Sequence, residues 1–333
     1  MRRSLSGQLV LEDEGSFFVG GEVVATDYPM LPNTGLGAPG HITVNQMYVR
    51  YWIPAAKIDL APVVMVHGSV HTGKTWETTP DGREGWATYF ARSGFSVYAV
   101  DHCGRGRSGF NPSPINQARA DSHAASLPAI QITTREGAWL NFRLGPSYGR
   151  FWPDSQFPED AVDQYFSQLV PNAEATLVDG GANTVNALAA LLDRIGPAIV
   201  MVHSQSGSYG LDLIRKRPKL VKGLINIEGS CTPVSAQEIE ATLAKIPLLS
   251  LWGDHSIGAA GLNGDERRNG CMATVAALRA AGGRATFALL PDLGIRGNSH
   301  MLMLEKNNLR IADLVLEWIG ENVPKNRAKE ALI

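Results

Sequence analysis

Short apolar runs alternate with helical patterns along most of the chain. Two strand-like stretches, residues 7–28 and 41–53, come first and predict an antiparallel N-terminal hairpin. Helical patterns separate the later runs, and an amphipathic helix is expected from about Met303 to Asn322. Such alternation is typical of a mainly parallel central sheet flanked by helices, an α/β fold whose ligands bind at the carboxyl ends of the strands. The later strands are predicted at Val63–His67, Phe95–Asp101, Ala198–Ser204, Gly223–Glu228, Pro247–Gly253 and Ala285–Leu290.

Residues 109–180 interrupt this alternation. They are rich in Pro, Ala, Ser and aromatic residues and contain no clean strand pattern. A helical cap over the strand ends accounts for both the length and the aromatic content, whereas the plainer alternative is a packed surface excursion. We therefore expect residues 1–108 and 181–333 to form the core and residues 109–180 to form an inserted cap.

Composition excludes several classes of protein. The 333 residues are 44% apolar and 19% charged, with a formal net charge of −2, so we expect no nucleic-acid partner and no attraction to anionic membranes. No apolar run reaches the ~18 residues of a membrane span. The odd number of cysteines (Cys103, Cys231 and Cys271) argues against a disulfide framework. No secretory signal is visible, so the sequence as it stands favours the cytoplasm, with an exported mature form as the alternative.

A serine-rich turn links the run Ala198–Ser204 to a helical stretch. A serine at a tight strand-to-helix turn is typical of a nucleophile elbow, which needs small residues two positions before and after the nucleophile. Ser206 meets this condition because Ser204 and Ser208 flank it. Ser204 as nucleophile would instead place Val202 two positions before it, where it crowds the turn, so we predict Ser206. The alternative is a serine-rich helix cap without catalytic function.

Two further turns precede this elbow. Val63–Gly68 ends in His-Gly, and the next residue, Ser69, is placed to supply a backbone N–H to an oxyanion hole together with Gly207. Asp101–Ser108 has the pattern Asp-x-x-Gly-x-Gly-x-Ser, which we interpret as a structural turn. We interpret His67 as a structural loop histidine and not as the catalytic base.

The base and the acid should follow the nucleophile in the order acid, then histidine. His300 comes after the last predicted strand and is the expected base. Ser256 occupies the usual acid position after the seventh strand, so we expect the acid to be Glu228, at the carboxyl end of the sixth strand. A buried carboxylate there needs a partner, and His300 provides one. Asp254 is the alternative acid.

At these residues the chain resembles the bacterial esterase-713-like family of α/β-hydrolases. The family's type member carries two adjacent, disulfide-linked cysteines in the oxyanion loop where this chain has Ser69 and Val70, so that chemistry does not carry over. The resemblance implies a Ser/Glu/His triad at Ser206, Glu228 and His300, a cap and a homodimer. It rests on the segments Gly15–Gly21, Gln46–Tyr51, Thr75–Arg83, His203–Gly207 and Gly297–Met301.

These observations predict a serine hydrolase that cleaves carboxylic esters or lactones through an acyl-enzyme on Ser206. The substrate is expected to be a small molecule, with Gln205, Val70 and Trp76 among its contacts. We expect no metal or organic cofactor.

Other functions stay open from the sequence. The same fold supports catalytically idle ligand-binding proteins, thioesterases and carbon–carbon bond hydrolases. A metal-dependent hydrolase would have to use His67 and His71 with Asp254 and His255, although neither HExxH nor paired CxxC occurs.

Overall fold

The centre of the protein is an eight-stranded sheet with the order β1-β2-β4-β3-β5-β6-β7-β8. The computed structural model describes residues 7–26, 39–172, 180–232, 234–259 and 264–326. The strands are β1 (Leu11–Thr26), β2 (Gly40–Pro54), β3 (Val63–Val66), β4 (Val97–Val100), β5 (Ala198–His203), β6 (Val221–Ile227), β7 (Leu248–Trp252) and β8 (Ala285–Leu289).

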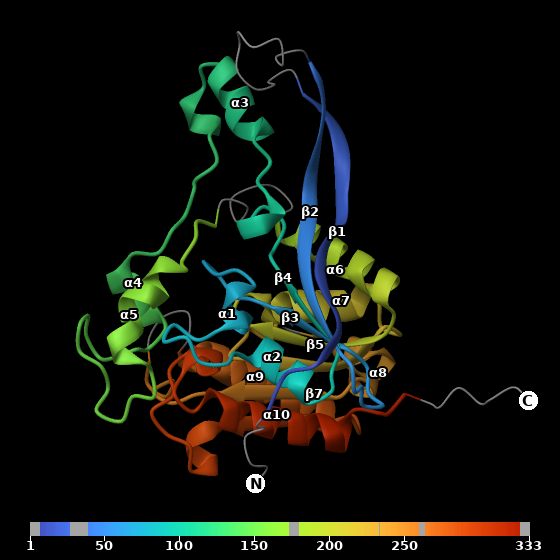
Figure 1. Cartoon of the computed structure of the whole chain (residues 1–333), viewed down its shortest axis with the longest axis vertical. Helices are drawn as coiled ribbons and strands as arrows, with labels where there is room; N and C mark the ends of the chain where they lie inside the picture. Colours follow the sequence, from blue (N-terminus) through green and yellow to red (C-terminus); the bar gives the residue numbers. More distant parts are fainter. Residues whose placement is uncertain (1–6, 27–38, 173–179, 233, 260–263, 327–333) are drawn as a thin grey trace, which may run out of the picture.

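The pairing confirms the predicted fold class. β1 pairs with β2, and β2 with β4, in antiparallel fashion, while β4, β3, β5, β6, β7 and β8 run parallel. All eight predicted strands are present. The β1–β2 hairpin extends well beyond the body of the molecule (Figure 1).

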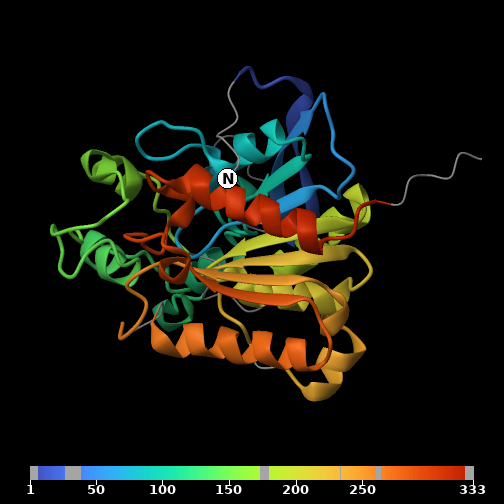
Figure 2. The same cartoon turned by 90° about the horizontal axis from the view of Figure 1, so that it is seen from below.

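Helices cover both faces of the sheet, as expected for a parallel sheet whose strands are apolar on both sides. Val63 and Met65 of β3 pack with α2 and α10, whereas Val64 and Val66 pack with α6 and α7. Figure 2 shows α10 on one side of the sheet and α9 on the other. The covering helices are α1 (Lys74–Glu77), α2 (Trp86–Arg92), α6 (Gly180–Ile195), α7 (Ser206–Lys216), α8 (Ala236–Ala241), α9 (Asp265–Ala280) and α10 (Asn308–Asn322).

The last helix differs from its prediction. α10 begins at Asn308 instead of near Met303, because Leu302–Leu304 forms a separate buried 3₁₀ turn. Glu305 follows that turn and accepts a hydrogen bond from the backbone N–H of Ser299 at 2.5 Å. The described ranges also contain the 3₁₀ turns η1 (Gly106–Ser108), η2 (Ala124–Ser126), η3 (Glu159–Ala161), η5 (Leu243–Lys245) and η6 (Leu290–Leu293).

The predicted insertion consists of two differently placed parts. α3 (Ser113–Ala120) lies near the far end of the β1–β2 hairpin, whereas α4 (Arg135–Asn141) and α5 (Val162–Ser167) lie against the body (Figure 1). The described part of residues 109–180 contributes no strand to the central sheet.

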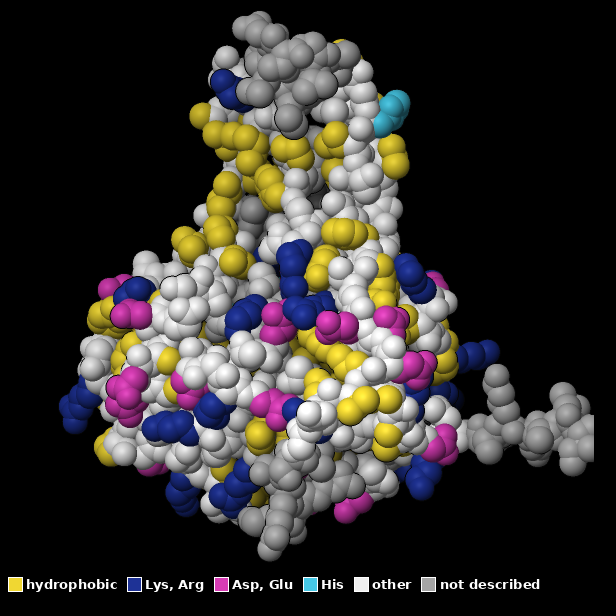
Figure 3. All heavy atoms as spheres, viewed as in Figure 1, with side chains coloured by type: hydrophobic (Ala, Val, Ile, Leu, Met, Phe, Trp, Pro, Cys, Tyr) yellow, Lys and Arg dark blue, Asp and Glu magenta, His cyan; other side chains and the backbone are white. Residues whose placement is uncertain are grey.

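The projecting arm, formed by the outer hairpin and α3, has a more apolar surface than the body, where Lys, Arg, Asp and Glu are dispersed (Figure 3). Its exposed apolar side chains include Phe18 and Val23 of β1. The homodimer implied by the family resemblance stays a prediction. No described helix combines the length and the hydropathy that a membrane crossing requires.

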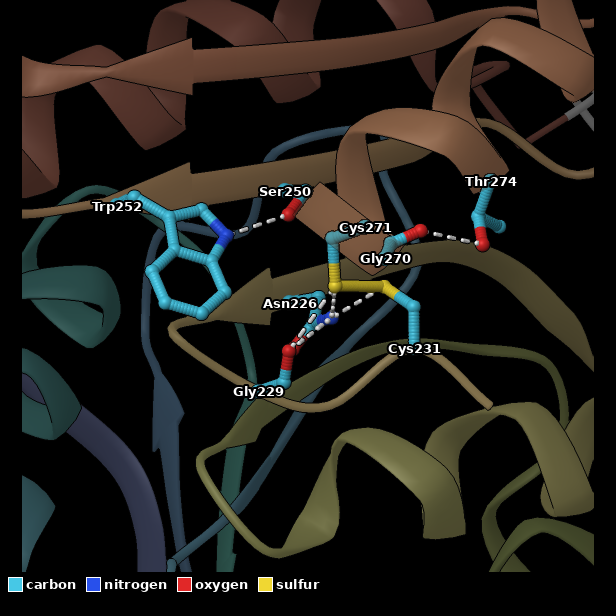
Figure 4. Close-up of a disulfide and its surroundings, with 8 residues drawn as sticks. All are labelled: Asn226, Gly229, Cys231, Ser250, Trp252, Gly270, Cys271 and Thr274. Atoms are coloured by element: carbon cyan, nitrogen blue, oxygen red, sulfur yellow. Dashed lines mark hydrogen bonds between the residues drawn. A yellow bond between two sulfur atoms is a disulfide. The ribbon is translucent and has the colours of Figure 1, made fainter. Parts of the chain in front are cut away.

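A disulfide joins Cys231 to Cys271, with the two Cα atoms 5.0 Å apart, so the expectation that the cysteines form no disulfide is wrong. Figure 4 shows that it links the loop after β6 to α9. The odd count arises because Cys103 is buried and free. Sequence spacing did not reveal the pair, because the two residues meet only when β6 and α9 fold together.

Candidate active site

A cavity of about 380 Å³ opens among the loops that follow β3 and β5, the loop after β6, and α4. This volume lies within the range of small-molecule sites. The residues on its wall come from elements far apart in the sequence and include Ser69, Val70, Asn141, Phe142, Ser204 and Gln205. Its position agrees with the expected site at the carboxyl ends of the parallel strands.

Glu228 and His300 form a hydrogen-bonded pair, and the ring of His300 stacks on Phe142, which lines this cavity. Oε2 of Glu228 lies 2.8 Å from Nδ1 of His300, and both side chains are completely buried. Oε1 accepts hydrogen bonds from Arg143 at 2.5 Å and from the backbone N–H of Gly253 at 2.6 Å. Burial alone raises the pKa of Glu228, but the charges and hydrogen bonds of Arg143 and His300 outweigh burial and lower it. Glu228 is therefore a carboxylate at neutral pH.

His300 is held in a fixed orientation. Its backbone N–H donates to the carbonyl of Phe142 at 2.9 Å, and the two rings stack with centroids 5.6 Å apart. Burial lowers the pKa of His300 to about 4, although Glu228 acts in the opposite direction. Since Nδ1 faces the carboxylate and Nε2 has no hydrogen-bond partner among the described residues, the neutral ring carries an unoccupied acceptor, as a general base requires.

Asp254, the alternative acid, does not contact His300. Its carboxylate accepts hydrogen bonds from the backbone N–H groups of His255 at 2.8 Å and Gly297 at 3.2 Å. Its own N–H donates to Asn298 at 2.7 Å. Asp254 therefore fixes the loop that leads to His300.

The metal ligands considered from the sequence do not come together. The rings of His67 and His71 contact the carbonyls of Gly68 and Ser69 at 2.8 and 2.7 Å. Nε2 of His67 also accepts from the backbone of His102, which supports its interpretation as a structural residue. In the described ranges the group that could hold a metal is Asp154, Asp254 and His255, and both oxygens of Asp254 are already hydrogen-bonded.

Ser204 has the geometry of an elbow nucleophile. It follows β5 directly, lies on the cavity wall and has a φ of 53°. A non-glycine residue in this region is strained, and such strain concentrates at functional sites. Its carbonyl accepts hydrogen bonds from the backbone N–H groups of Gly207 at 3.0 Å and Ser230 at 3.2 Å. These two hydrogen bonds fix the conformation of the turn. Its hydroxyl makes no hydrogen bond with any described residue.

Ser206, the predicted nucleophile, lies behind this turn. It is completely buried and does not line the cavity. Its hydroxyl donates to the carbonyl of His67 at 2.5 Å and lies 2.9 Å from Nε2 of His102. Because the single hydroxyl proton is given to the carbonyl, Nε2 of His102 must be the donor in the second contact. These contacts argue against the prediction of Ser206, since its proton is given to a protein carbonyl and its side chain has no exposed surface.

The rule on small flanking residues favours Ser206, but glycines outside the turn make room around Ser204. Gly210 of α7 accommodates Val202: a Cβ on Gly210 would lie 3.2 Å from Cγ1 of that valine. Gly68 lies against the turn that follows β5, since a Cβ there would lie 2.8 Å from Cβ of Ser204. The rule expects the space to come from small residues two positions before and after the serine. Around Ser204 the space comes instead from glycines of α7 and of the loop after β3.

The N–H of Gly207, the second predicted oxyanion donor, already has an acceptor within the protein. Its N–H donates to Ser204 at 3.0 Å, and a Cβ on it would collide with the backbone of Ser230. Gly207 therefore permits close approach of α7 to the loop after β6. The N–H groups of Ser69, as predicted, and of Gln205 lie at the cavity and donate to no described residue.

Comparison with known proteins identifies the family. No family model matches the chain. A solved bacterial esterase is 39% identical, with a TM-score of 0.89 over 97% of this chain and 100% of that one. A protein described as a probable secreted lipase, from Fungal sp. (strain ATCC 74256), is 30% identical over an alignment of 317 positions that covers 82% of this chain and 85% of the relative. The chain belongs to the α/β-hydrolase superfamily.

In this α/β-hydrolase, three residues that the sequence did not indicate contact the site. Asn172 accepts from the N–H of Val70 at 2.8 Å and donates to the hydroxyl of Ser69 at 2.6 Å. Arg143 binds Glu228, and Arg267 of α9 lines the cavity. All three meet the site only through tertiary contacts, so no local motif marks them.

The predicted substrate contacts have mixed outcomes. Gln205 and Val70 line the cavity of this hydrolase. Trp76 does not: it is completely buried and packs against Trp86 and His203, with ring centroids 5.9 and 6.5 Å away. Its position in a segment that resembles the family reflects packing of the core.

Proposed function

We propose that this protein is a serine hydrolase that cleaves carboxylic esters through an acyl-enzyme on Ser204, with His300 as base and Glu228 as the orienting acid. The observation that carries the proposal is the contrast between two serines: Ser204 is strained and lines the cavity, whereas the hydroxyl of Ser206 is buried and hydrogen-bonded. The printed descriptions of the two relatives, an esterase and a lipase, support ester cleavage.

The first half of the reaction forms the acyl-enzyme. Oγ of Ser204 attacks the ester carbonyl carbon while Nε2 of His300 accepts the hydroxyl proton. Glu228 holds the ring through Nδ1 and stabilises the imidazolium, and it stays ionised because Arg143 lowers its pKa. The tetrahedral intermediate collapses, the C–O bond to the alcohol breaks, and His300 returns the proton to the leaving alkoxide.

The second half regenerates the enzyme. His300 removes a proton from water, the resulting hydroxide attacks the acyl carbon, and the carboxylic acid leaves as Ser204 regains its proton. In both halves the negative oxygen is stabilised by the N–H groups of Ser69 and Gln205. Loss of one such donor typically costs about 100- to 1,000-fold in kcat.

The N–H of Ser69 is positioned from outside its own loop. Asn172 contacts both Ser69 and Val70, and Val70 holds a positive φ of 55°. The carbonyl of Gly68 accepts from Arg105 at 2.8 Å. This loop is therefore fixed before substrate arrives, which is the preorganisation that an oxyanion hole requires.

The disulfide and the relative that is described as secreted favour the exported alternative for localisation. Disulfides persist mainly in oxidising compartments. We therefore propose that the mature protein functions outside the reducing cytosol.

Hydrolysis of p-nitrophenyl acetate by matched variants tests the mechanism. Ser204→Ala should lower kcat by about 10⁴- to 10⁶-fold, because it removes the nucleophile. Ser206→Ala, the control two residues away, should keep kcat within about tenfold of wild type if it stays folded, since it removes only the two hydrogen bonds of a hydroxyl behind the turn. A large loss in Ser206→Ala with activity preserved in Ser204→Ala contradicts the assignment.

A further inference from the structure

The cavity beside Ser204 has a one-sided charge. Among the described residues that line it, Arg267 is the one cationic side chain, and no Asp or Glu occurs. Most of the rest are serine, threonine, asparagine or glutamine, which can donate hydrogen bonds. A cavity of this kind concentrates anions, because its charge acts where water is partly excluded.

Arg267 is held in place by its helix. It lies in the first turn of α9, where its neighbour Arg268 binds Asp265 at 2.5 Å and the carbonyl of Ser256 at 2.7 Å. One turn further, Cys271 joins α9 to the loop after β6. The guanidinium is therefore presented to the cavity by an element with two independent anchors.

The carboxylate of Glu228, whose charge acts on Arg267, is held by other groups. Glu228 is bound by Arg143, by Gly253 and by His300. Burial lowers the pKa of the Arg267 guanidinium, and the charge of Glu228 raises it in part. The pKa of Arg267, about 10, leaves it protonated at neutral pH.

The charge of Arg267 opposes protonation of His300 unless an anion binds to that guanidinium. Arg267 and Arg143 both disfavour a protonated His300, yet His300 must become an imidazolium while Ser204 attacks. A negative group on the substrate, placed against Arg267, would remove part of this repulsion in the transition state.

We propose that the preferred substrates are esters that carry a carboxylate a few bonds from the scissile carbonyl, and that Arg267 binds this carboxylate. This inference rests on the proposed function. Guanidinium and carboxylate form the strongest class of protein hydrogen bonds, often two in parallel. Arg267 is then a specificity-determining residue that touches the substrate away from the reacting atoms.

A competition assay between monoethyl glutarate and ethyl valerate tests the proposal, because the two esters have acyl chains of equal length and differ in a terminal carboxylate. Wild type should favour monoethyl glutarate in kcat/KM by about 10-fold or more, and Arg267→Gln should lower that ratio about 10- to 100-fold. Arg267→Lys, which keeps the charge but not the planar fork, should lower it less.

Arg279→Gln is the matched control. It removes the same charge from the last turn of α9, where Arg279 binds the carbonyl of Ala285 at 2.6 Å, and it should leave the ratio unchanged. A merely structural effect of Arg267→Gln would slow both esters and leave the ratio intact, which would overturn the proposal.

Two results separate this inference from the proposed function. If wild type cleaves p-nitrophenyl acetate but prefers ethyl valerate, or cleaves neither ethyl ester, the carboxylate preference is wrong and the serine mechanism stands. If p-nitrophenyl acetate is still cleaved by Ser204→Ala, the mechanism itself is wrong.

Discussion

The turn Ser204–Ser206 has two faces, and they differ in whether their polar groups have hydrogen-bond partners within the protein. On the cavity face, the hydroxyl of Ser204 and the N–H groups of Ser69 and Gln205 make no hydrogen bond with a described residue. On the buried face, Ser206 joins the carbonyl of His67 to the ring of His102. The two serines are two positions apart in the sequence, but Ser204 faces the cavity and Ser206 faces protein.

Polar groups without a protein partner can interact with a substrate, whereas polar groups paired within the protein stabilise the fold. A donor already committed to a protein acceptor must break that bond before it can stabilise a developing charge, and this cost opposes catalysis. A buried polar group without a partner destabilises the fold. On the cavity face the polar groups lack protein partners, but water or substrate can enter and pair with them. On the buried face the hydroxyl of Ser206 is fully paired, so this cost does not arise.

The comparison is tested most strongly by Glu228→Gln, which leaves shape intact but removes the charge behind the catalytic base. We expect kcat to fall by about 10²- to 10⁴-fold, less than for loss of the nucleophile, because the acid orients the base and does not attack. Buried Arg143 also loses its anionic partner, so the melting temperature should fall. Unchanged kcat with p-nitrophenyl acetate would exclude Glu228 as the acid.

A smaller effect is expected from Asn172→Ala. This change frees the backbone of Val70 and the hydroxyl of Ser69, so the loop that presents the oxyanion donor loses its support. We expect kcat to fall by about 10- to 100-fold with little change in KM, since less than one full donor is lost. Asn141→Ala, on the same cavity wall, is the control. A rise in KM of Asn172→Ala at unchanged kcat would assign Asn172 to substrate binding.

The pH dependence of kcat/KM should show the lowered pKa of His300. The neutral ring is the active form, and burial lowers its pKa from 6.5 to about 4. Activity should therefore stay level as the pH falls from 8 to about 6 and decline only below the ordinary histidine range. An acid limb with its midpoint at 6.5 or above would show that the ring titrates as an exposed histidine. Circular dichroism over the same pH range would separate titration from unfolding.

The smallest effect on activity belongs to the buried face. Ser206→Ala leaves the carbonyl of His67 and the N–H of His102 without their common partner, so we expect it to cost about 1–3 kcal/mol of unfolding free energy. Urea titration monitored by tryptophan fluorescence measures this cost. Ser208→Ala is the control, because its hydroxyl binds the carbonyl of Gln205 at 3.1 Å and is only half-buried. Equal stability of Ser206→Ala and Ser208→Ala would contradict a structural role for the hydroxyl of Ser206.

Much of the fold could be predicted because it depends on local patterns. The short strands β3 to β8 are mostly apolar, and the order of turns along the chain places them in one sheet. Glu228 and His300 could be located for the same reason, since each follows a strand end whose position the pattern sets. Their contact at 2.8 Å agrees with that reasoning.

The remaining features depend on contacts between distant segments. Choosing between Ser204 and Ser206 required knowledge of Gly68 and Gly210, which make the space around the turn. Arg143 reaches Glu228 across 85 positions in the sequence. Likewise, Cys231 and Cys271 are brought together by the packing of α9, over a sequence separation of 40. No pattern within one element contains this information.

The central claim, that Ser204 and not Ser206 is the nucleophile, is tested most directly by covalent labelling. A fluorophosphonate should phosphonylate the protein once, and fragmentation of the labelled peptide by tandem mass spectrometry should locate the adduct on Ser204. Ser206→Ala should still be labelled and Ser204→Ala should not. An adduct on Ser206, or labelling that survives in Ser204→Ala, would contradict the account.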